Sequence, residues 1–201
     1  MTRLRAFALL LVAAGSAQLG AGWYLPAKAA VAQVLLRVAW ERTREDGAPH
    51  RPWPWARHWP VARLSAPALG VDEIVLAGAT GASLAFGPGH LDGTAMPGAA
   101  GNAVVAGHRD TSFAFLSRLR PGDALVVETP ALGRRRFVVR ATRVVEASDR
   151  APLLPTARPT LTLVTCYPFD ALWPGTPLRY VVRAEEDGAP RTAAPSPRAP
   201  A

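Results

Sequence analysis

The chain has 201 residues, 49% of them hydrophobic, so it can form one domain with a buried core and is not a wholly disordered chain. The formal net charge is +8, but Lys28 is the only lysine and the arginines are scattered along the sequence. A nucleic-acid-binding protein more often carries a basic stripe interleaved with aromatic residues, so the charge pattern argues against that class.

The first predicted element is an uncharged, mostly apolar run from Ala6 to Leu25. A helix of this length, at about 1.5 Å per residue, just spans the ~30 Å hydrocarbon layer of a bilayer. A cleaved signal peptide is the alternative, but the run exceeds the usual apolar core of about 7 to 15 residues and no clear Ala-x-Ala site ends it. We expect a retained membrane anchor over residues 1–26. Basic residues flank it on both sides, so charge alone does not orient it.

A second helix, amphipathic, is predicted from Ala27 to Glu45, because apolar residues recur there at helical spacing. It could lie on the bilayer or on the folded domain. Proline and glycine end it in a linker from Asp46 to Pro54, so residues 27–52 are expected to form a juxtamembrane helix and linker. Four tryptophans in this part of the chain suit either the membrane interface or the cover of a barrel edge: Trp40, Trp53, Trp55 and Trp59.

Short β-prone runs separated by glycine and proline follow from Val61 to Glu185. Their close spacing predicts an all-β fold, an antiparallel barrel or sandwich, in a domain over residues 53–186. The expected strands are Glu73 to Ala77, Ser83 to Phe86, Asn102 to Ala106, Ala124 to Thr129, Arg136 to Glu146 (a two-part strand or hairpin arm), Thr160 to Tyr167 and Leu178 to Ala184.

One short helix is expected among the strands, from Ser112 to Leu119, with Asp110 or Thr111 as its N-cap. Its apolar residues should pack it against the barrel. The proline- and alanine-rich tail, residues 187–201, is expected to be disordered.

Cys166 is the only cysteine, so it cannot form an internal disulfide. It closes the run Thr-Leu-Val-Thr-Cys at the end of a predicted strand. His108 lies in Gly-His-Arg-Asp-Thr just after another strand, and Arg179 lies in Pro-Leu-Arg-Tyr-Val-Val at the start of a third. A thiol becomes a good nucleophile as the thiolate, which a neighbouring imidazolium or guanidinium favours. The three residues could therefore form a nucleophilic site if the strands bring them together.

The order of these three motifs resembles that of the sortases, cysteine transpeptidases of the bacterial cell surface, over about Trp53 to Glu185. The apolar N-terminal segment, the Pro-Trp-Pro-Trp sequence from Pro52 to Trp55 and the Thr-Leu-Val-Thr-Cys motif are most similar to the proteobacterial branch of that family. The resemblance implies a closed β-barrel of about eight strands with short helices. It also implies a single-pass anchor in the cytoplasmic (inner) membrane with the catalytic domain outside.

By the same resemblance, Cys166 would attack the Thr-Gly bond of an LPxTG-like C-terminal sorting signal on a secreted protein, and the resulting thioester would pass to an amine acceptor. His108 would act as general acid and base, and Arg179 would hold the oxyanion or the peptide carbonyls. Some sortases use calcium, but no acidic cluster here matches such a site, and no metal or cofactor is expected.

Alternative interpretations remain for each residue. Cys166 could be a small buried hydrophobic residue, as in a non-catalytic, membrane-tethered β-domain that serves as a scaffold or ligand-binding module. His108 could cap the helix that follows it. Arg183 competes with Arg179, because both lie on one face of the same predicted strand.

Four further residues are predicted near the substrate. Thr165 precedes the nucleophile, and Asp170 and Trp173 lie on the loop that follows it, where they could shape substrate entry or simply pack and solvate the loop. His90 lies in a tight glycine-rich turn, where it is either structural or a neighbour of the site.

Overall fold

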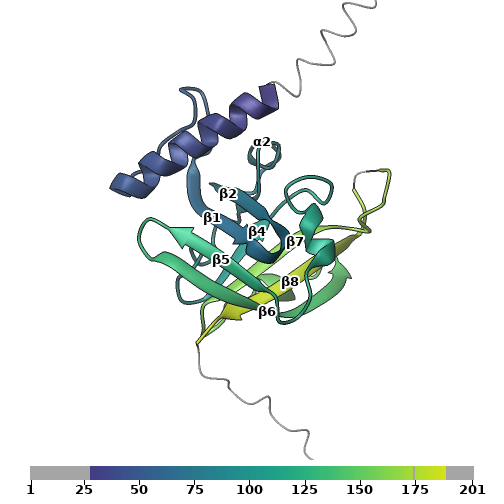
Figure 1. Cartoon of the computed structure of the whole chain (residues 1–201). Helices are drawn as coiled ribbons and strands as arrows, with labels where there is room; N and C mark the ends of the chain where they lie inside the picture. Colours follow the sequence, from purple (N-terminus) through teal and green to yellow (C-terminus); the bar gives the residue numbers. More distant parts are fainter. Residues whose placement is uncertain (1–27, 174, 189–201) are drawn as a thin grey trace, which may run out of the picture.

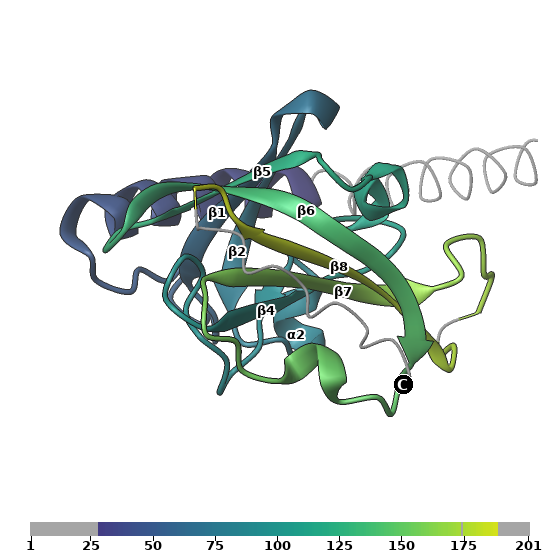
Figure 2. The ribbon, with the colours of Figure 1, turned by 90° about the horizontal axis from the view of Figure 1, so that it is seen from below.

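The structure, a computed structural model, describes residues 28–173 and 175–188. Within them, eight strands close into a barrel in the order β1-β2-β3-β4-β7-β8-β6-β5 (Figures 1 and 2). The strands are β1 (Pro60–Ala66), β2 (Val71–Ala77), β3 (Gly89–His90), β4 (Asn102–Ala106), β5 (Ala124–Thr129), β6 (Gly133–Glu146), β7 (Thr160–Tyr167) and β8 (Leu178–Glu186). Short helices connect some of them: η1 (Pro67–Leu69), α2 (Gly81–Leu84), η2 (Ala114–Arg118) and η3 (Ala151–Leu153).

The predicted all-β class is confirmed, and of the two predicted architectures, barrel and sandwich, the structure is a barrel. The sheet is not purely antiparallel, however, because β2 pairs with β3 and β4 pairs with β7 in parallel. The parallel pairing of β4 and β7 matters for function. It places the carboxyl ends of both strands at the same end of the barrel.

The barrel interior is filled by alternate residues of each strand, as the two-residue period of a strand requires. In β7, Leu161 and Leu163 point inward, and Val182 and Ala184 of β8 meet them. The same alternation sends Thr162, Val164 and Cys166 to the outer face. Small and large side chains share the interior, where Ala62 and Ala103 lie in one cluster with Phe113 and Phe137.

The two-part character predicted for the long strand is confirmed in β6. Its first half pairs with β5 and its second half with β8, and the register shifts between Val139 and Ala141. A bulge of this kind bends a strand and increases its local twist, which lets one strand serve both neighbours in a closed barrel.

Residues 83–86 do not form the expected strand. Ser83 and Leu84 belong instead to α2, which begins after Thr80, and Ala85 and Phe86 form the turn that follows it. The Ser83 hydroxyl accepts a hydrogen bond from the Thr80 backbone N–H at 3.0 Å. This reciprocal capping of the first turn favours the helix over an extended conformation.

The helix expected from Ser112 to Leu119 is a shorter 3-10 helix, η2, and its N-cap is Phe113 rather than Asp110 or Thr111. The backbone N–H of Phe113 donates to the His108 carbonyl at 2.9 Å, so the chain is still turning where the helix was expected to begin. The predicted contact with the barrel is confirmed, because Phe115, Leu116 and Leu119 lie in the core.

Residues 28–46 form the helix expected after the apolar N-terminal run, and it lies across β1 and β2 (Figure 1). Leu36 and Trp40 pack against Ile74 and Leu76 of β2. Trp53 contacts Phe86 edge-on with ring centroids 5.0 Å apart. Trp40 and Trp53 therefore cover the domain.

The anchor predicted from Ala6 to Leu25 falls outside the described residues, and so does the tail predicted over residues 187–201 except its first two residues. The first of these, Asp187, is held in place, because its N–H donates to the Arg136 carbonyl at 2.8 Å. Within the part of the chain that the structure describes, no helix combines the length and the hydropathy that a membrane span needs.

Candidate active site

Cys166 lies near the end of β7, and the β7–β8 ladder sets Arg179 directly opposite it. Directly opposed residues of an antiparallel pair project from the same face of the sheet, with Cβ atoms about 4.5–5.5 Å apart. Leu163 and Thr165 are buried on the inner side of β7, so Cys166 and Arg179 lie on the outer face. The sulfur and the guanidinium are therefore brought together by strand register.

His108 reaches the same place from the other side of β7. The parallel register pairs Ala106 with Val164, and the Gly107 N–H donates to the Val164 carbonyl at 3.1 Å. The Thr165 hydroxyl donates to the Gly107 carbonyl at 2.7 Å. His108 is the next residue along, in step with Cys166, and it is exposed. The three predicted catalytic residues thus lie at one end of the barrel, Cys166 on β7, Arg179 on β8 and His108 just after the end of β4.

Gly107, the residue just after β4, allows the backbone before His108 to pack closely against the core. A Cβ atom on it would lie 2.7 Å from the Phe113 ring, which is fully buried. The ring packs directly on the backbone that carries His108, and the Phe113 N–H holds the His108 carbonyl. The glycine in Gly-His-Arg is therefore required for close packing at the base of the His108 segment.

The side chains of the three residues are close in register but are not bonded to one another. Within residues 28–173 and 175–188, no hydrogen bond or ion pair joins Cys166, His108 and Arg179. Nη1 of Arg179 donates to the carbonyl oxygens of Thr176 and Leu178, at 2.7 and 2.8 Å. These bonds fix the guanidinium at the start of β8. Its other nitrogens make no hydrogen bond to the described residues.

Two alternative interpretations are wrong. Cys166 is partly exposed, so it is not the buried hydrophobic residue of the non-catalytic hypothesis. His108 does not cap the following helix, because no side chain caps η2.

Arg109, which was not among the predicted site residues, ties the two loops of the site together. Its Nη2 donates to the carbonyl oxygens of Ala171 and Trp173, at 2.5 and 2.9 Å, and Nη1 donates to the Thr176 hydroxyl at 3.5 Å. The described parts of the loop between β7 and β8, residues 168–173 and 175–177, are thereby held against the segment that carries His108. Its position beside His108 was the only signal in the sequence.

The other predicted site residues are spread over the same region. Asp170 and Trp173 are exposed on the loop after Cys166, and 79% of Trp173 is accessible. Thr165 is buried, and its hydroxyl is used on the Gly107 carbonyl, so it positions the His108 segment. His90 is buried in β3 rather than in a turn, and its Nε2 lies 2.8 Å from the Ala95 carbonyl oxygen. The structure gives His90 a structural position.

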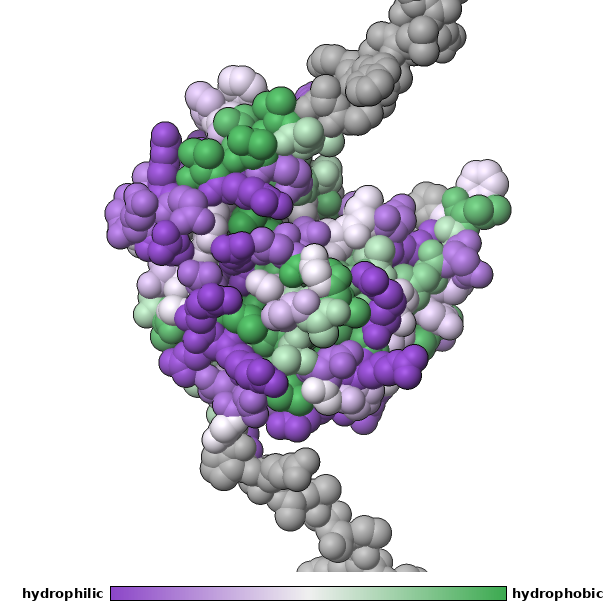
Figure 3. Space-filling model, viewed as in Figure 1, coloured by the Kyte–Doolittle hydropathy of each residue, from purple (hydrophilic) through white to green (hydrophobic). Residues whose placement is uncertain are grey.

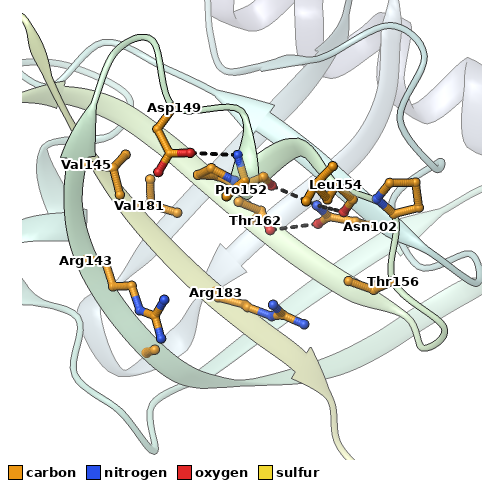
Figure 4. Close-up of a pocket in the computed structure, with 13 residues that line it drawn as sticks. Asn102, Arg143, Val145, Asp149, Pro152, Leu154, Thr156, Thr162, Val181 and Arg183 are labelled. Atoms are coloured by element: carbon orange, nitrogen blue, oxygen red, sulfur yellow. Dashed lines mark hydrogen bonds between the residues drawn. The ribbon is translucent and has the colours of Figure 1, made fainter.

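A pocket of about 420 Å³ opens on the outer face that carries Cys166 (Figure 4). Thr162, Val181 and Arg183 contribute to its floor, and the loop between β6 and β7 forms one wall. Asn102 anchors this loop, because its Nδ2 donates to the carbonyl oxygens of Pro152 and Leu154 at 2.9 and 3.0 Å. Arg183 pairs with Thr162 and lines the pocket, whereas Arg179 pairs with Cys166 and lies beside the thiol. Of the two competing arginines, Arg179 is therefore the one next to the nucleophile.

A family model described as the sortase domain matches residues 64–187 of the chain. The chain belongs to the sortase family. It is 29% identical to sortase D of Bacillus subtilis (strain 168) over 120 residues, which are 59% of this chain and 60% of that sortase. The chain thus spans about 60% of the length of this curated relative.

Solved sortases share the fold. The catalytic domain of SrtD from B. anthracis is 35% identical, with a TM-score of 0.55 and coverage of 64% of this chain and 88% of that one. Sortase A from Corynebacterium diphtheriae is 26% identical, with a TM-score of 0.59 and coverage of 71% and 66%. A Clostridium perfringens sortase D5 transpeptidase, 23% identical, has a TM-score of 0.65 and coverage of 79% and 99%, and this likeness concerns the fold alone.

Proposed function

We propose that this sortase is a cysteine transpeptidase that cleaves an LPxTG-like C-terminal sorting signal of a secreted protein and transfers the acyl part to an amine. One observation carries the proposal. The strand registers set Cys166 between His108 and Arg179 on the outer face of the barrel, with the thiol accessible. Membership of the sortase family agrees with this chemistry.

In the first half of the reaction, the Cys166 thiolate attacks the carbonyl carbon of the Thr-Gly bond. The electron pair of the carbonyl moves to its oxygen, and the Arg179 guanidinium stabilises the oxyanion as a fixed, charged donor. The intermediate collapses, the C–N bond breaks, and protonated His108 gives its proton to the departing amine. A thioester remains on Cys166.

In the second half, neutral His108 takes a proton from the incoming amine as that amine attacks the thioester carbonyl. The C–S bond breaks, the thiolate is restored and a new amide bond forms. His108 lies on an exposed segment at the open end of β4, where leaving and incoming amines can exchange.

The pocket on the same face supports an extended peptide as the substrate. Thr162, Val164 and Cys166 line up along the outer face of β7, and Thr162 belongs to the pocket. Cys166 is four positions after Thr162, a span of roughly 13 Å in a strand. A peptide segment of about five residues could therefore reach from the thiol into the pocket.

The finer assignment to the proteobacterial branch remains part of the proposal. It is supported by the Pro-Trp-Pro-Trp sequence and the apolar N-terminal run. The relatives above are named sortase A and sortase D, and they do not distinguish this branch.

We further propose a location at the cytoplasmic membrane, with the catalytic domain outside it. The helix over residues 28–46 packs one side on the barrel and exposes a hydrophobic stripe on another: Val31, Val34, Leu35 and Val38. Figure 3 shows hydrophobic residues gathered over this helix in the upper part of the molecule. Trp55, 80% exposed, lies beside the apolar pocket that this helix lines. In the sequence the stripe follows the apolar run from Ala6 to Leu25, and it suits the surface of a bilayer.

Location can be tested on membranes from cells that express the full chain. The protein should resist extraction by alkaline carbonate, and alkaline phosphatase fused after the last residue should be active, because that enzyme works outside the cytoplasm. Release by carbonate, or an inactive fusion, would contradict the proposed location.

The activity is tested with the full-length protein in detergent, an internally quenched Gln-Leu-Pro-Ala-Thr-Gly peptide and a short glycine peptide as the amine. Wild type should cleave the Thr-Gly bond and form the new amide, detected by mass spectrometry. Cys166→Ala should be inactive, and His108→Ala nearly so. The absence of product from wild type, or equal product from Cys166→Ala, would overturn the proposal.

A further inference from the structure

Two arginines project into the pocket that continues from Cys166 along β7. The β6–β8 ladder pairs Ala141 with Arg183 and Arg143 with Val181. Arg143 and Arg183 are therefore diagonal neighbours on one face, close enough for long side chains to meet. Figure 4 shows both guanidinium groups on one side of the pocket. The site described above uses neither of them.

No close carboxylate neutralises this pair within the described residues. Arg143 makes no ion pair there, and Arg183 approaches Glu185 only at 4.0 Å. Glu185 also lies 3.5 Å from Arg140. Two adjacent positive groups without a close counter-ion repel one another, so an anion bound between them would be stabilised by both.

The remaining charged group of the pocket, Asp149, does not fill this role. Its Oδ1 accepts a hydrogen bond from the Ala151 N–H at 2.8 Å, and Figure 4 shows it across the pocket from the two arginines. Val145, Leu154 and Pro155 provide apolar lining. The pocket thus combines an apolar part, suited to a side chain such as leucine, with a cationic part.

The cationic part lies at a defined distance from the thiol. Arg183 pairs with Thr162, four residues before Cys166 on β7, so the two points are roughly 13 Å apart. The acyl part of the substrate must stay bound while the amines exchange. It therefore occupies the walled pocket, and the leaving part occupies the open end near His108. An extended peptide with its scissile threonine at Cys166 places the fifth residue N-terminal to the cleaved bond beside Arg183.

We propose that Arg143 and Arg183 form a subsite for an acidic side chain in the residue directly before the LPxTG-like motif. The inference rests on the proposed function, whose substrate it specifies. This sortase would select secreted proteins with aspartate or glutamate at that position.

The test measures peptide binding separately from turnover. The full-length Cys166→Ala protein in detergent is titrated into fluorescein-labelled peptides that differ only at the residue before the motif, Glu-Leu-Pro-Ala-Thr-Gly and Gln-Leu-Pro-Ala-Thr-Gly. Anisotropy is recorded at low and at high salt. Arg143→Ala and Arg183→Ala are added singly and together, and Arg134→Ala, an exposed arginine of β6 that does not line the pocket, serves as the matched control.

The glutamate peptide should bind about fivefold more tightly than the glutamine peptide at low salt. This factor corresponds to the upper end of the range measured for partly exposed ion pairs. The preference should shrink at high salt and disappear in the double arginine variant, but persist in Arg134→Ala. Equal binding of the two peptides, no binding of either, or a preference that survives loss of both arginines would overturn the proposal. Turnover by wild type reports separately on the proposed function, so the two failures can be told apart.

Discussion

Cys166 and Arg179 lie directly opposite one another on β7 and β8, so the backbone ladder fixes their approach. Sites held by regular strands are more rigid than sites held by loops, and a rigid donor stabilises developing charge without reorganising. The loop between the two strands can vary without moving either residue. His108 is held less directly, by the bonds of Gly107 and Phe113 around it.

Loss of the Arg179 guanidinium should slow the chemical step. Arg179→Ala is expected to lower kcat and kcat/KM together by about 10²- to 10³-fold, because the oxyanion exists only around the transition state. Arg179→Lys keeps the charge without the planar fork and should be intermediate. Steady-state kinetics with the quenched peptide measure both, with Arg136→Ala as a control on the exposed face of β6. Activity of Arg179→Ala within about twofold of wild type would remove the oxyanion role assigned to this residue.

Removal of Arg109 should release the loop over residues 168–177. Arg109→Ala loses the bonds to the carbonyls of Ala171 and Trp173, so a chymotrypsin-type protease should cut faster after the exposed Leu172. Peptide turnover should fall by about tenfold, because Arg109 adjoins His108 and misplacement of that catalytic group is costly. Arg118→Ala, an exposed arginine on η2, should change neither property. Unchanged proteolysis in Arg109→Ala would show that the loop is held by other contacts.

Gly107→Ala should destabilise the fold and displace His108. The added methyl group would lie 2.7 Å from the buried Phe113 ring, and overpacking of this kind costs about 1–3 kcal/mol. Gly81→Ala in α2 is the matched control, since a Cβ there meets nothing within 4 Å. Urea unfolding of the two variants gives the comparison. A Gly107→Ala protein as stable as Gly81→Ala would mean that the Phe113 ring can move aside freely.

Glu73 should make stability depend on pH. Burial in β2 raises the pKa of its carboxyl to about 7, and the negative charge of Asp72 adds to the rise. The folded state therefore holds the proton more tightly than the unfolded chain, whose value is near 4.5. The stability that Glu73 contributes is present below that value and is lost as pH rises to about 7. Glu73→Gln should accordingly gain stability over wild type at pH 8, and the gain should vanish near pH 4.

Urea titrations of wild type and Glu73→Gln across this pH range measure the effect. His58 acts in the opposite direction, because burial lowers the pKa of its imidazole and the stability it contributes is lost as pH falls. Both proteins carry His58, so the difference between them isolates Glu73. A difference that stays constant from pH 4 to pH 8 would contradict the prediction.

Strands with a dense β-branched pattern could be predicted from the sequence to the residue: Asn102–Ala106, Ala124–Thr129 and Thr160–Tyr167. β1 was not predicted as a strand of its own, because its inward positions include the small residues Ala62 and Ala66, which weaken the alternation. β3, two residues long, carries no periodicity. At α2, the capping interaction between Thr80 and Ser83 decided the local structure against the strand that was expected.

The three central site residues could be predicted because each lies in a motif with a recognisable order. The order of the motifs does not reveal the strand registers. The structure shows that the β4–β7 and β7–β8 registers bring the three motifs together. Arg109 donates mainly to backbone carbonyls, which any sequence offers, so its partners carried no signal. The diagonal approach of Arg143 to Arg183 on one side of the pocket likewise depends on the bulge in β6, which shifts the register between Val139 and Ala141.

The most direct test of the central claim is intact-protein mass spectrometry of the full chain mixed with the sorting peptide in the absence of added amine. Wild type should gain the mass of the peptide's acyl part on Cys166, and a short glycine peptide or hydroxylamine should remove it. Arg179→Ala should acylate slowly, and Cys166→Ala should gain no mass. If the mass of wild type stays unchanged while the peptide is cleaved, or if Cys166→Ala acquires the same adduct, a thioester at Cys166 is not the intermediate.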